Sequence, residues 1–385
     1  IVRLNIGVFG SESCKLSSLT HLHNLESLEA HNLSNSILNP FYNLTRLKMG
    51  NSNPYMTTLT RLQNLHVIEP RTSRRTTLPN PSALTKLVAE ASSAYLFLRL
   101  LPPLDTFSNL KTLALLSCGS IPLNNLTSLE SFTTNNIISP NEIAQMTSLK
   151  HLELSERCFG EENGDVVDLS GWTQLTNLKV LIIKDTLNRF TRSIAFISKL
   201  PLVAATISGM TRDDGECIQR LKPHLVKELS VEMNKTSMFK NDLTRLNRLE
   251  SLTVRATTPV IIGGIDTLTR LTQLVLIKAQ CTSVQSLTNL KILRAELVNT
   301  SGITRLTNLE HLEALISVQA IDDIAQLTRL RDLVLNFDRP FESNALSTLT
   351  NLTRICLPEF HYPTLDWLAP LTDLQHLDLS SSLIT

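Results

Sequence analysis

The side chains that most often carry out chemistry, cysteine and histidine, are scattered in this chain. No cysteine lies near another, and no C-x-x-C or Cys/His spacing typical of a zinc site occurs. His21 and His23 lie close together but have no further ligand group nearby, which favours surface histidines. We therefore predict no metal site. The cysteines are interpreted as buried free thiols, which weakly favours a reducing compartment, and they are Cys14, Cys118, Cys158, Cys217, Cys281 and Cys356.

Motifs of catalysis are also missing from the sequence. The glycine pair Gly263-Gly264 is not followed by the lysine and hydroxyl of a phosphate-binding loop, and neither G-x-S-x-G nor H-E-x-x-H occurs. The acidic run at 161–168 lacks the spacing of a known calcium loop, so a solvated loop is favoured. The arginines at 71–75 favour a solvated loop too, with anion docking as the alternative. We predict no enzyme activity, no cofactor and no small-molecule substrate.

Composition narrows the remaining classes of protein. The chain has 385 residues, with 36 Lys and Arg against 35 Asp and Glu, a balance that argues against a globally basic nucleic-acid binder. Hydrophobic residues make up 42% of the chain, which excludes intrinsic disorder. The most apolar stretch, 94–101, is short and contains Arg99. We expect neither nucleic-acid binding nor insertion into a membrane.

A repeat runs through the whole sequence in the form L-x-x-L-x-L, whose first residue we call the lead. Three residues after the lead, every position except Ala205 is Leu, Ile or Phe. Because side chains alternate along a strand, the two later leucines point to one face and their neighbours to the other. Spacings between leads run from 19 to 29 residues. The 18 leads are Ile1, Leu25, Leu44, Leu65, Leu84, Leu110, Leu129, Leu149, Leu178, Leu202, Val226, Leu249, Leu271, Leu290, Leu309, Leu330, Leu352 and Leu374.

This pattern resembles the leucine-rich repeat family over essentially the whole chain. The specific part is Leu306-Thr-Asn-Leu309-Glu-His-Leu312-Glu-Ala314. The stretch Ile321-Asp-Asp-Ile324-Ala-Gln-Leu327-Thr-Arg-Leu330 is similar to the subclass with repeats of about 22 residues found in internalins and phosphatase regulators. The resemblance implies an α/β solenoid, an arc with 18 short parallel strands on its concave face and short helical, 3-10 or extended segments on its convex face.

One feature of the family is weak in this chain. The Asn or Cys that the family places eight residues after the lead occurs here only at Asn234 and Cys118. We predict one solenoid over residues 1–385, truncated at both ends, with divergent repeats or a bend at about 185–240. A bend between two sub-arrays and a single divergent pair of repeats are both compatible with that segment.

Function in such an array is expected on the exposed strand positions two, four and six residues after the lead. The +4 column begins Glu29, Lys48, Glu69 and Val88, where opposite charges on adjacent strands satisfy one another. A second area contains Leu116, Val180 and Ile182. Between 273 and 354 aliphatic side chains alternate with charged ones, which is typical of interaction sites, although β-branched residues also simply favour strands. The predicted partner-binding residues are Val275, Ile277, Ile292, Arg294, His311, Glu313, Leu315, Asp332, Val334 and Arg354.

These observations favour a non-catalytic scaffold or adaptor that binds a protein partner through its concave face. One alternative is the ectodomain of a cell-surface receptor or adhesin, and another is the targeting module of a larger enzyme complex. An intracellular location is slightly favoured. The receptor alternative is supported by the six N-x-S/T sequons at Asn32, Asn43, Asn125, Asn234, Asn299 and Asn351.

Overall fold

A computed structural model of the chain describes most of its repeat motifs. The described residues are 3–6, 21–31, 38, 40–50, 56, 58–68, 78–90, 102–117, 123, 126–155, 158, 169–184, 194–210, 218, 221–233, 243–281, 283–296, 302–337, 344–357, 361–362, 365–379 and 383–384. The chain divides into two compact units, Ile1–Pro201 and Leu202–Thr385. Whether they form one continuous solenoid stays a prediction.

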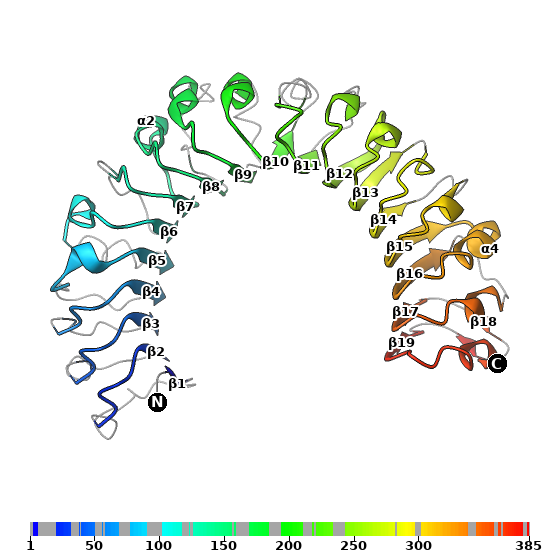
Figure 1. Cartoon of the computed structure of the whole chain (residues 1–385), viewed down its shortest axis with the longest axis horizontal. Coiled ribbons are helices and arrows are strands. Elements are labelled where there is room, and N and C mark those ends of the chain that lie inside the picture. The colour runs from blue at the N-terminus through cyan, green and yellow to red at the C-terminus, as the bar shows by residue number, and fades with distance from the viewer. Residues whose placement is uncertain are drawn as a thin grey trace. The chain divides into compact units, whose positions relative to one another are not determined.

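The first unit is built on parallel strands that follow each other in chain order, each paired with the next (Figure 1). The return segments carry short helices, mostly of the 3-10 type, because repeats of this length leave little room for a longer helix. The strands are β1 (Arg3–Ile6), β2 (Ser27–His31), β3 (Arg46–Gly50), β4 (Asn64–Ile68), β5 (Lys86–Glu90), β6 (Thr112–Leu116), β7 (Ser131–Thr134), β8 (His151–Leu154) and β9 (Val180–Lys184). The helices are η2 (Pro81–Ala83), η3 (Leu104–Thr106), α2 (Pro140–Ala144), η4 (Ser170–Gln174) and η5 (Ile194–Lys199).

The second unit repeats this plan. Its strands are β10 (Ala204–Met210), β11 (Glu228–Met233), β12 (Ser251–Ile262), β13 (Gln273–Cys281), β14 (Ile292–Glu296), β15 (His311–Ile316), β16 (Asp332–Phe337), β17 (Arg354–Cys356) and β19 (His376–Asp378), with a separate parallel pair of β18 (His361–Tyr362) and β20 (Leu383–Ile384). Its helices are η7 (Leu243–Arg245), η8 (Ile265–Thr267), η9 (Ile303–Arg305), η10 (Val318–Ala320), α4 (Ile321–Ile324), η11 (Ala345–Thr348) and η12 (Asp366–Leu368). In each unit the parallel strands and short convex segments confirm the predicted fold class.

The core is formed by the leucine columns of the repeat. In the repeat that leads into β15, Leu306, Leu309, Leu312 and Ala314 are each at most 2% exposed. A single such strand cannot cover its apolar face, so each repeat relies on its neighbours and on the return segments. In the first unit, Trp172 of η4 is fully buried, donates from Nε1 to the carbonyl of Pro140 at 3.0 Å and meets Phe196 edge-on. The predicted columns are therefore the core of both units.

One predicted lead is wrong. Leu65 pairs with Leu47, which lies three residues after its own lead, so the lead of this repeat is Leu62. The sequence allows either alignment because leucines recur every three residues at 59, 62 and 65. The correction replaces Glu69 in the +4 column by His66, whose Nε2 lies 2.9 Å from Glu90 Oε1. Val67, fully buried, then occupies the +5 position that Pro70 would have broken.

A polar ladder between repeats stands in a column that was not predicted. An asparagine directly before the lead donates from Nδ2 to the carbonyl two residues before the preceding lead. This bond satisfies turn carbonyls that the strands leave unpaired. It joins Asn43 to His23, Asn109 to Ser82, Asn177 to Thr147, Asn289 to Thr269, Asn308 to Thr288 and Asn351 to Thr328, at 2.8 to 3.0 Å. The predicted ladder residues Asn234 and Cys118 lie outside the described residues, so that column stays a prediction.

Candidate functional site

The predicted partner-binding residues lie on neighbouring strands of the second unit. Ile292, His311, Asp332 and Arg354 are aligned in register across β14 to β17. Val275, Arg294, Glu313 and Val334 form the next row, two residues further along each strand. Ile277 and Leu315 stand two residues beyond that row, on β13 and β15. We call the strand face that carries these three rows the inner face of the second unit, because the strands line the inner side of its curve (Figure 1).

The charged residues among the ten predicted ones are paired with one another, whereas Arg255, the register partner of Ile277, is exposed and has no carboxylate within 4.0 Å among the described residues. Arg294 Nε lies 2.6 Å from Glu313 Oε2 on the adjacent strand. Asp332 Oδ2 lies 3.4 Å from His311 Nδ1 and 3.5 Å from Arg354 Nη1. Ion pairs as exposed as these contribute little to stability, but they leave few charges on the inner face for a partner to neutralise. The ten predicted residues therefore carry close to no net charge.

The aliphatic residues between the pairs differ in exposure. Leu315 is 44% exposed, whereas Ile277, Ile292 and Val334 are half-buried. Val275 is only 8% exposed, so the expectation that it faces solvent is wrong. Its register partners on the two flanking strands are Thr253 and the long side chain of Arg294. An apolar stem such as that of arginine readily covers a smaller neighbour.

An irregular part of the sheet lies beside Ile277 and was not predicted. β12 has 12 residues, and its register with β13 shifts between Arg255 and Val260. Lys278 has φ 52°, a left-handed conformation that is costly for a residue with a side chain, and Ile261 is 62% exposed. The sequence signal for a longer strand here is the segment 257–262, which is β-branched except for Pro259. Ile261 therefore joins the candidate residues.

The second predicted apolar area, in the first unit, is less exposed. Leu116, Val180 and Ile182 are all half-buried. Farther along the same face, opposite charges alternate as expected, with Lys48 Nζ 2.6 Å from Glu29 Oε1 and Lys184 Nζ 2.7 Å from Glu153 Oε1.

Cys281 and Cys356 are free cysteines whose thiols have raised pKa values. Cys158 is buried. Burial raises the pKa of the Cys281 thiol to about 11. Burial, with a hydrogen bond to Asp378, also raises the pKa of Cys356. A thiol with a raised pKa is a poor nucleophile at neutral pH, because little of it is present as thiolate.

Neither a metal-binding group of side chains nor a membrane-spanning helix occurs among the described residues. They contain no group of three or more His, Cys, Asp or Glu side chains arranged to hold a metal ion. No helix in the part of the chain that the structure describes is long and apolar enough to cross a membrane.

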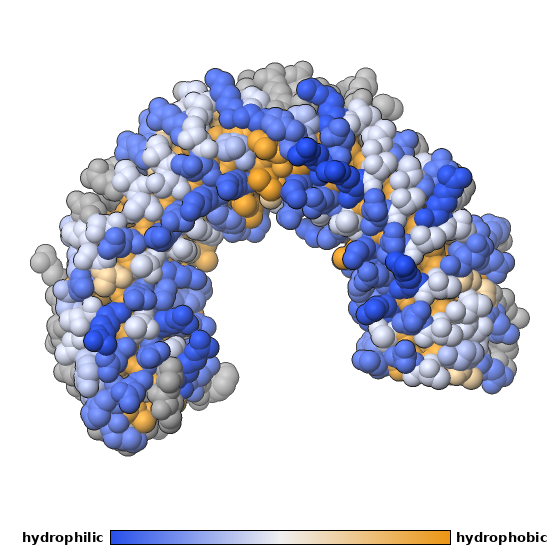
Figure 2. Space-filling model, viewed as in Figure 1, coloured by the Kyte–Doolittle hydropathy of each residue, from blue (hydrophilic) through white to orange (hydrophobic). Residues whose placement is uncertain are grey.

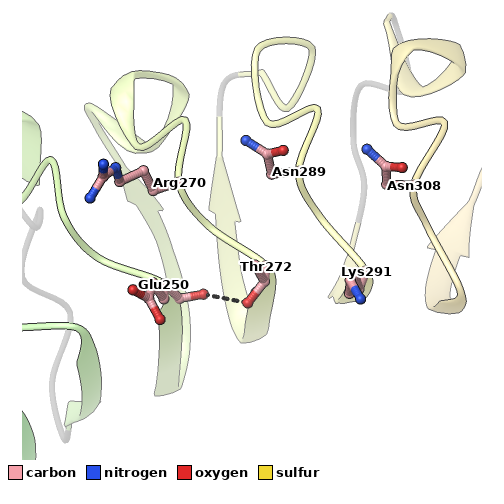
Figure 3. Close-up of a pocket in the computed structure, with 6 residues that line it drawn as sticks. All are labelled: Glu250, Arg270, Thr272, Asn289, Lys291 and Asn308. Atoms are coloured by element: carbon pink, nitrogen blue, oxygen red, sulfur yellow. Dashed lines mark hydrogen bonds between the residues drawn. The ribbon is translucent and has the colours of Figure 1, made fainter.

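A shallow depression of about 430 Å³ lies outside the inner face, on the flank where the chain enters the strands of the second unit. Figure 3 shows its lining in two rows. One row, directly before the leads, holds Arg270, Asn289 and Asn308, and the other, directly after the leads, holds Glu250, Thr272 and Lys291. Thr272 donates from its hydroxyl to the carbonyl of Glu250 at 3.0 Å. All six lining residues have polar or charged side chains, and they lie in the segments that lead into the strands.

Comparison with known proteins gives likeness in structure only. No family model matches the chain, and no curated protein matches it in sequence. Among solved structures, TLR13 in a complex with ssRNA13 has a TM-score of 0.58 at 16% identity, over 100% of this chain and 55% of that one. A TDR receptor has a TM-score of 0.50 at 14% identity, over 95% of this chain and 70% of that one. An internalin of Listeria monocytogenes, InlF, has a TM-score of 0.42 at 18% identity, over 92% and 87%.

At such low identity these likenesses bear on the fold alone. The about 22-residue subclass stays a prediction. The repeat columns, the register of the parallel strands and the likeness to TLR13 together identify the chain as having the leucine-rich repeat fold.

Proposed function

We propose that this protein is a non-catalytic scaffold that binds a protein partner through the inner face of its second unit. The observation that carries the proposal is the combination of Leu315 and Ile277, aliphatic side chains in reach of solvent, with charges that are already paired beside them. Exposed apolar residues inside a polar rim are typical of protein interfaces. A sheet whose strands are fixed by neighbouring repeats also loses little conformational entropy on binding.

The structural neighbours support a binding role without naming a partner. TLR13, in its complex with single-stranded RNA, and the TDR receptor are both receptors. For this chain, the paired inner-face charges and the aliphatic side chains favour a protein as the partner.

The receptor alternative loses part of its support. Asn43 and Asn351, two of the six sequon asparagines, donate their side-chain amides to backbone carbonyls of the preceding repeat. Their Asn-Leu-Thr sequences are therefore explained by the ladder and do not need a glycan as their reason.

The test compares two charge-inserting double variants. Ile277→Glu with Leu315→Glu places carboxylates on the proposed surface, and Leu116→Glu with Ile182→Glu does the same on the second apolar area. The partner is isolated with the wild-type protein from its native source, then purified and titrated against each variant by calorimetry. We expect the first variant to weaken binding at least about tenfold, since it buries two charges without partners, and the second to leave it unchanged. Loss of affinity in the second variant alone would contradict the proposal.

A further inference from the structure

The flank of the second unit carries more positive charge than its inner face. In the six repeats whose leads run from Val226 to Leu330, the positions directly before and after the lead form the two rows of Figure 3. These twelve positions are all described, and eight are exposed and four half-buried. Two are acidic, Glu250 and Glu310, and six are basic, namely Lys227, Arg248, Arg270, Lys291, Arg329 and Arg331. Figure 2 shows strongly hydrophilic residues on this side of the unit.

Both flank carboxylates are already occupied by lysines. Lys227 Nζ lies 2.8 Å from Glu250 Oε1, and Lys291 Nζ lies 3.5 Å from Glu310 Oε1. The arginines are different. No carboxylate of the described residues lies within 4.0 Å of the charged nitrogens of Arg270, Arg329 or Arg331.

Of these three arginines, Arg329 makes a side-chain hydrogen bond, but its partner is uncharged. Arg329 donates from Nη1 to the neutral Oδ1 of Asn308 at 2.6 Å. This contact orients the guanidinium without neutralising it, and its other N–H groups stay available as donors. These three guanidinium charges are therefore presented on one flank without a counter-charge among the described residues. The same holds for a fourth, Arg248, whose Nη1 donates to the carbonyl of His224 at 3.4 Å.

The spacing of these charges suits an extended polypeptide. Arg270 and Arg329 belong to repeats three strands apart, which is about 14 Å at the usual ~4.8 Å between strands. An extended chain covers that distance in about four residues. Between them the side-chain amides of Asn289 and Asn308 line the depression, and each keeps one Nδ2–H beside the one that it gives to the ladder. Guanidinium groups pair with carboxylates through two parallel hydrogen bonds, and amides can bond a peptide backbone.

We propose that this flank binds an acidic, extended segment of a protein partner, with Arg270, Arg329 and Arg331 as the groups that pair with its carboxylates. The inference deepens the proposed function and rests on it, since the segment belongs to the partner that the inner face binds. A nucleic acid is a poorer match. None of the twelve flank positions is Phe, Tyr or Trp, on which bases stack.

The experiment measures binding of a fluorescein-labelled polyglutamate peptide to the full chain by anisotropy, at low and at physiological salt. Arg270→Gln, Arg329→Gln and Arg331→Gln are combined in one flank variant. Lys111→Gln, Lys150→Gln and Lys179→Gln, combined on the corresponding flank of the first unit, remove the same number of charges as a matched control. We expect the flank variant to lose affinity about tenfold, as three exposed ion pairs would give, and the control variant to change it less than about twofold.

Two outcomes would overturn the inference. One is an equal loss in both variants, which would mean that only total charge matters. The other is tighter binding of a labelled oligouridine RNA than of the peptide, with the same dependence on the three arginines.

The double variant Ile277→Glu with Leu315→Glu separates this inference from the proposed function. It is expected to keep wild-type affinity for polyglutamate while it loses the purified partner. Should the partner be lost by that variant and fully retained by the flank variant, the inner-face proposal stands and the flank inference fails. Should the flank variant alone lose the partner, the inner-face proposal fails instead.

Discussion

The flanks of the two units use the same two positions of the repeat in different ways. In the first unit the basic residues stand beside an acidic one, since Glu130 lies 3.3 Å from Lys111 and 2.7 Å from Lys150 across neighbouring repeats. In the second unit the carboxylates are taken by lysines, and four flank arginines have no carboxylate within 4.0 Å among the described residues. In the first unit only Arg61 and Lys179 are in that position among the described flank residues, so the second unit presents more cationic charge.

Both units share the structural part of the flank, which sets the baseline for this comparison. Asn43 donates to the carbonyl of His23 and accepts from Arg61 at 2.9 Å. Asn308 makes the matching pair of bonds with Thr288 and Arg329. What differs between the flanks is therefore the charge placed on a common ladder, and not the ladder itself.

The largest expected effect comes from cutting that ladder. Asn43→Ala and Asn308→Ala each remove two hydrogen bonds and are expected to destabilise their own unit by about 1–2 kcal/mol. Urea unfolding, followed by hydrogen exchange to locate the weakened unit, measures the loss. Asn177→Ala and Asn289→Ala serve as controls, because each of these side chains makes one ladder hydrogen bond and about half the effect is expected. A large loss at Asn308 with none at Asn43 would contradict a shared structural role.

A smaller change should sharpen the charge difference. Glu250→Gln removes the carboxylate that holds Lys227 and so frees one more cation on the flank of the second unit. We expect affinity for polyglutamate to rise about two- to threefold, the effect of one exposed ion pair. Glu130→Gln on the first unit should leave that affinity unchanged within error, although it also frees lysines. Equal gains in both variants would show that the flanks do not differ.

The smallest effect concerns proton binding in the first unit. Hydrogen bonds from Lys150 and Lys111 lower the pKa of the Glu130 carboxyl below its ordinary value. Because the folded state has the lower pKa, the stabilisation is present above the unfolded pKa and is lost as pH falls through the folded pKa. Carbon-detected NMR titration should find Glu130 ionised at a pH where most glutamates are protonated. The double change Lys111→Gln with Lys150→Gln should return its pKa to the ordinary range, and an unaltered pKa there would refute the network.

The sequence predicts the fold well because burial of the leucine columns governs it. The leucine columns cannot distinguish two alignments that differ by three residues where leucines recur at 59, 62 and 65. The predicted lead at Leu65 was therefore wrong, and Glu69 was assigned to the exposed face in place of His66. The two alignments differ in the residue that they place at the buried +5 position. A lead at Leu62 places Val67 there, which fits a buried strand, whereas a lead at Leu65 places Pro70 there, which does not.

The candidate site was predicted in its register but not in its details. The alternation of strand side chains places all ten predicted residues on one face, yet it cannot tell that neighbouring side chains bury Val275. The extended β12, the left-handed Lys278 and the exposed Ile261 depend on how two adjacent repeats of unequal length fit together. The asparagine ladder was visible as a recurring Leu-Thr-Asn-Leu, but its bonds join side chain to backbone between repeats, which periodicity alone does not reveal.

The most direct test of the central claim is photocross-linking from single positions of the intact protein. A benzophenone amino acid replaces Leu315 on the inner face of the second unit or, as the control, Ile137 in the first unit, which is 53% exposed. After irradiation with the purified partner, mass spectrometry identifies the linked peptides. Cross-links are expected from position 315 and none from 137. Cross-links from 137 alone, or equal yields from both positions, would contradict the claim.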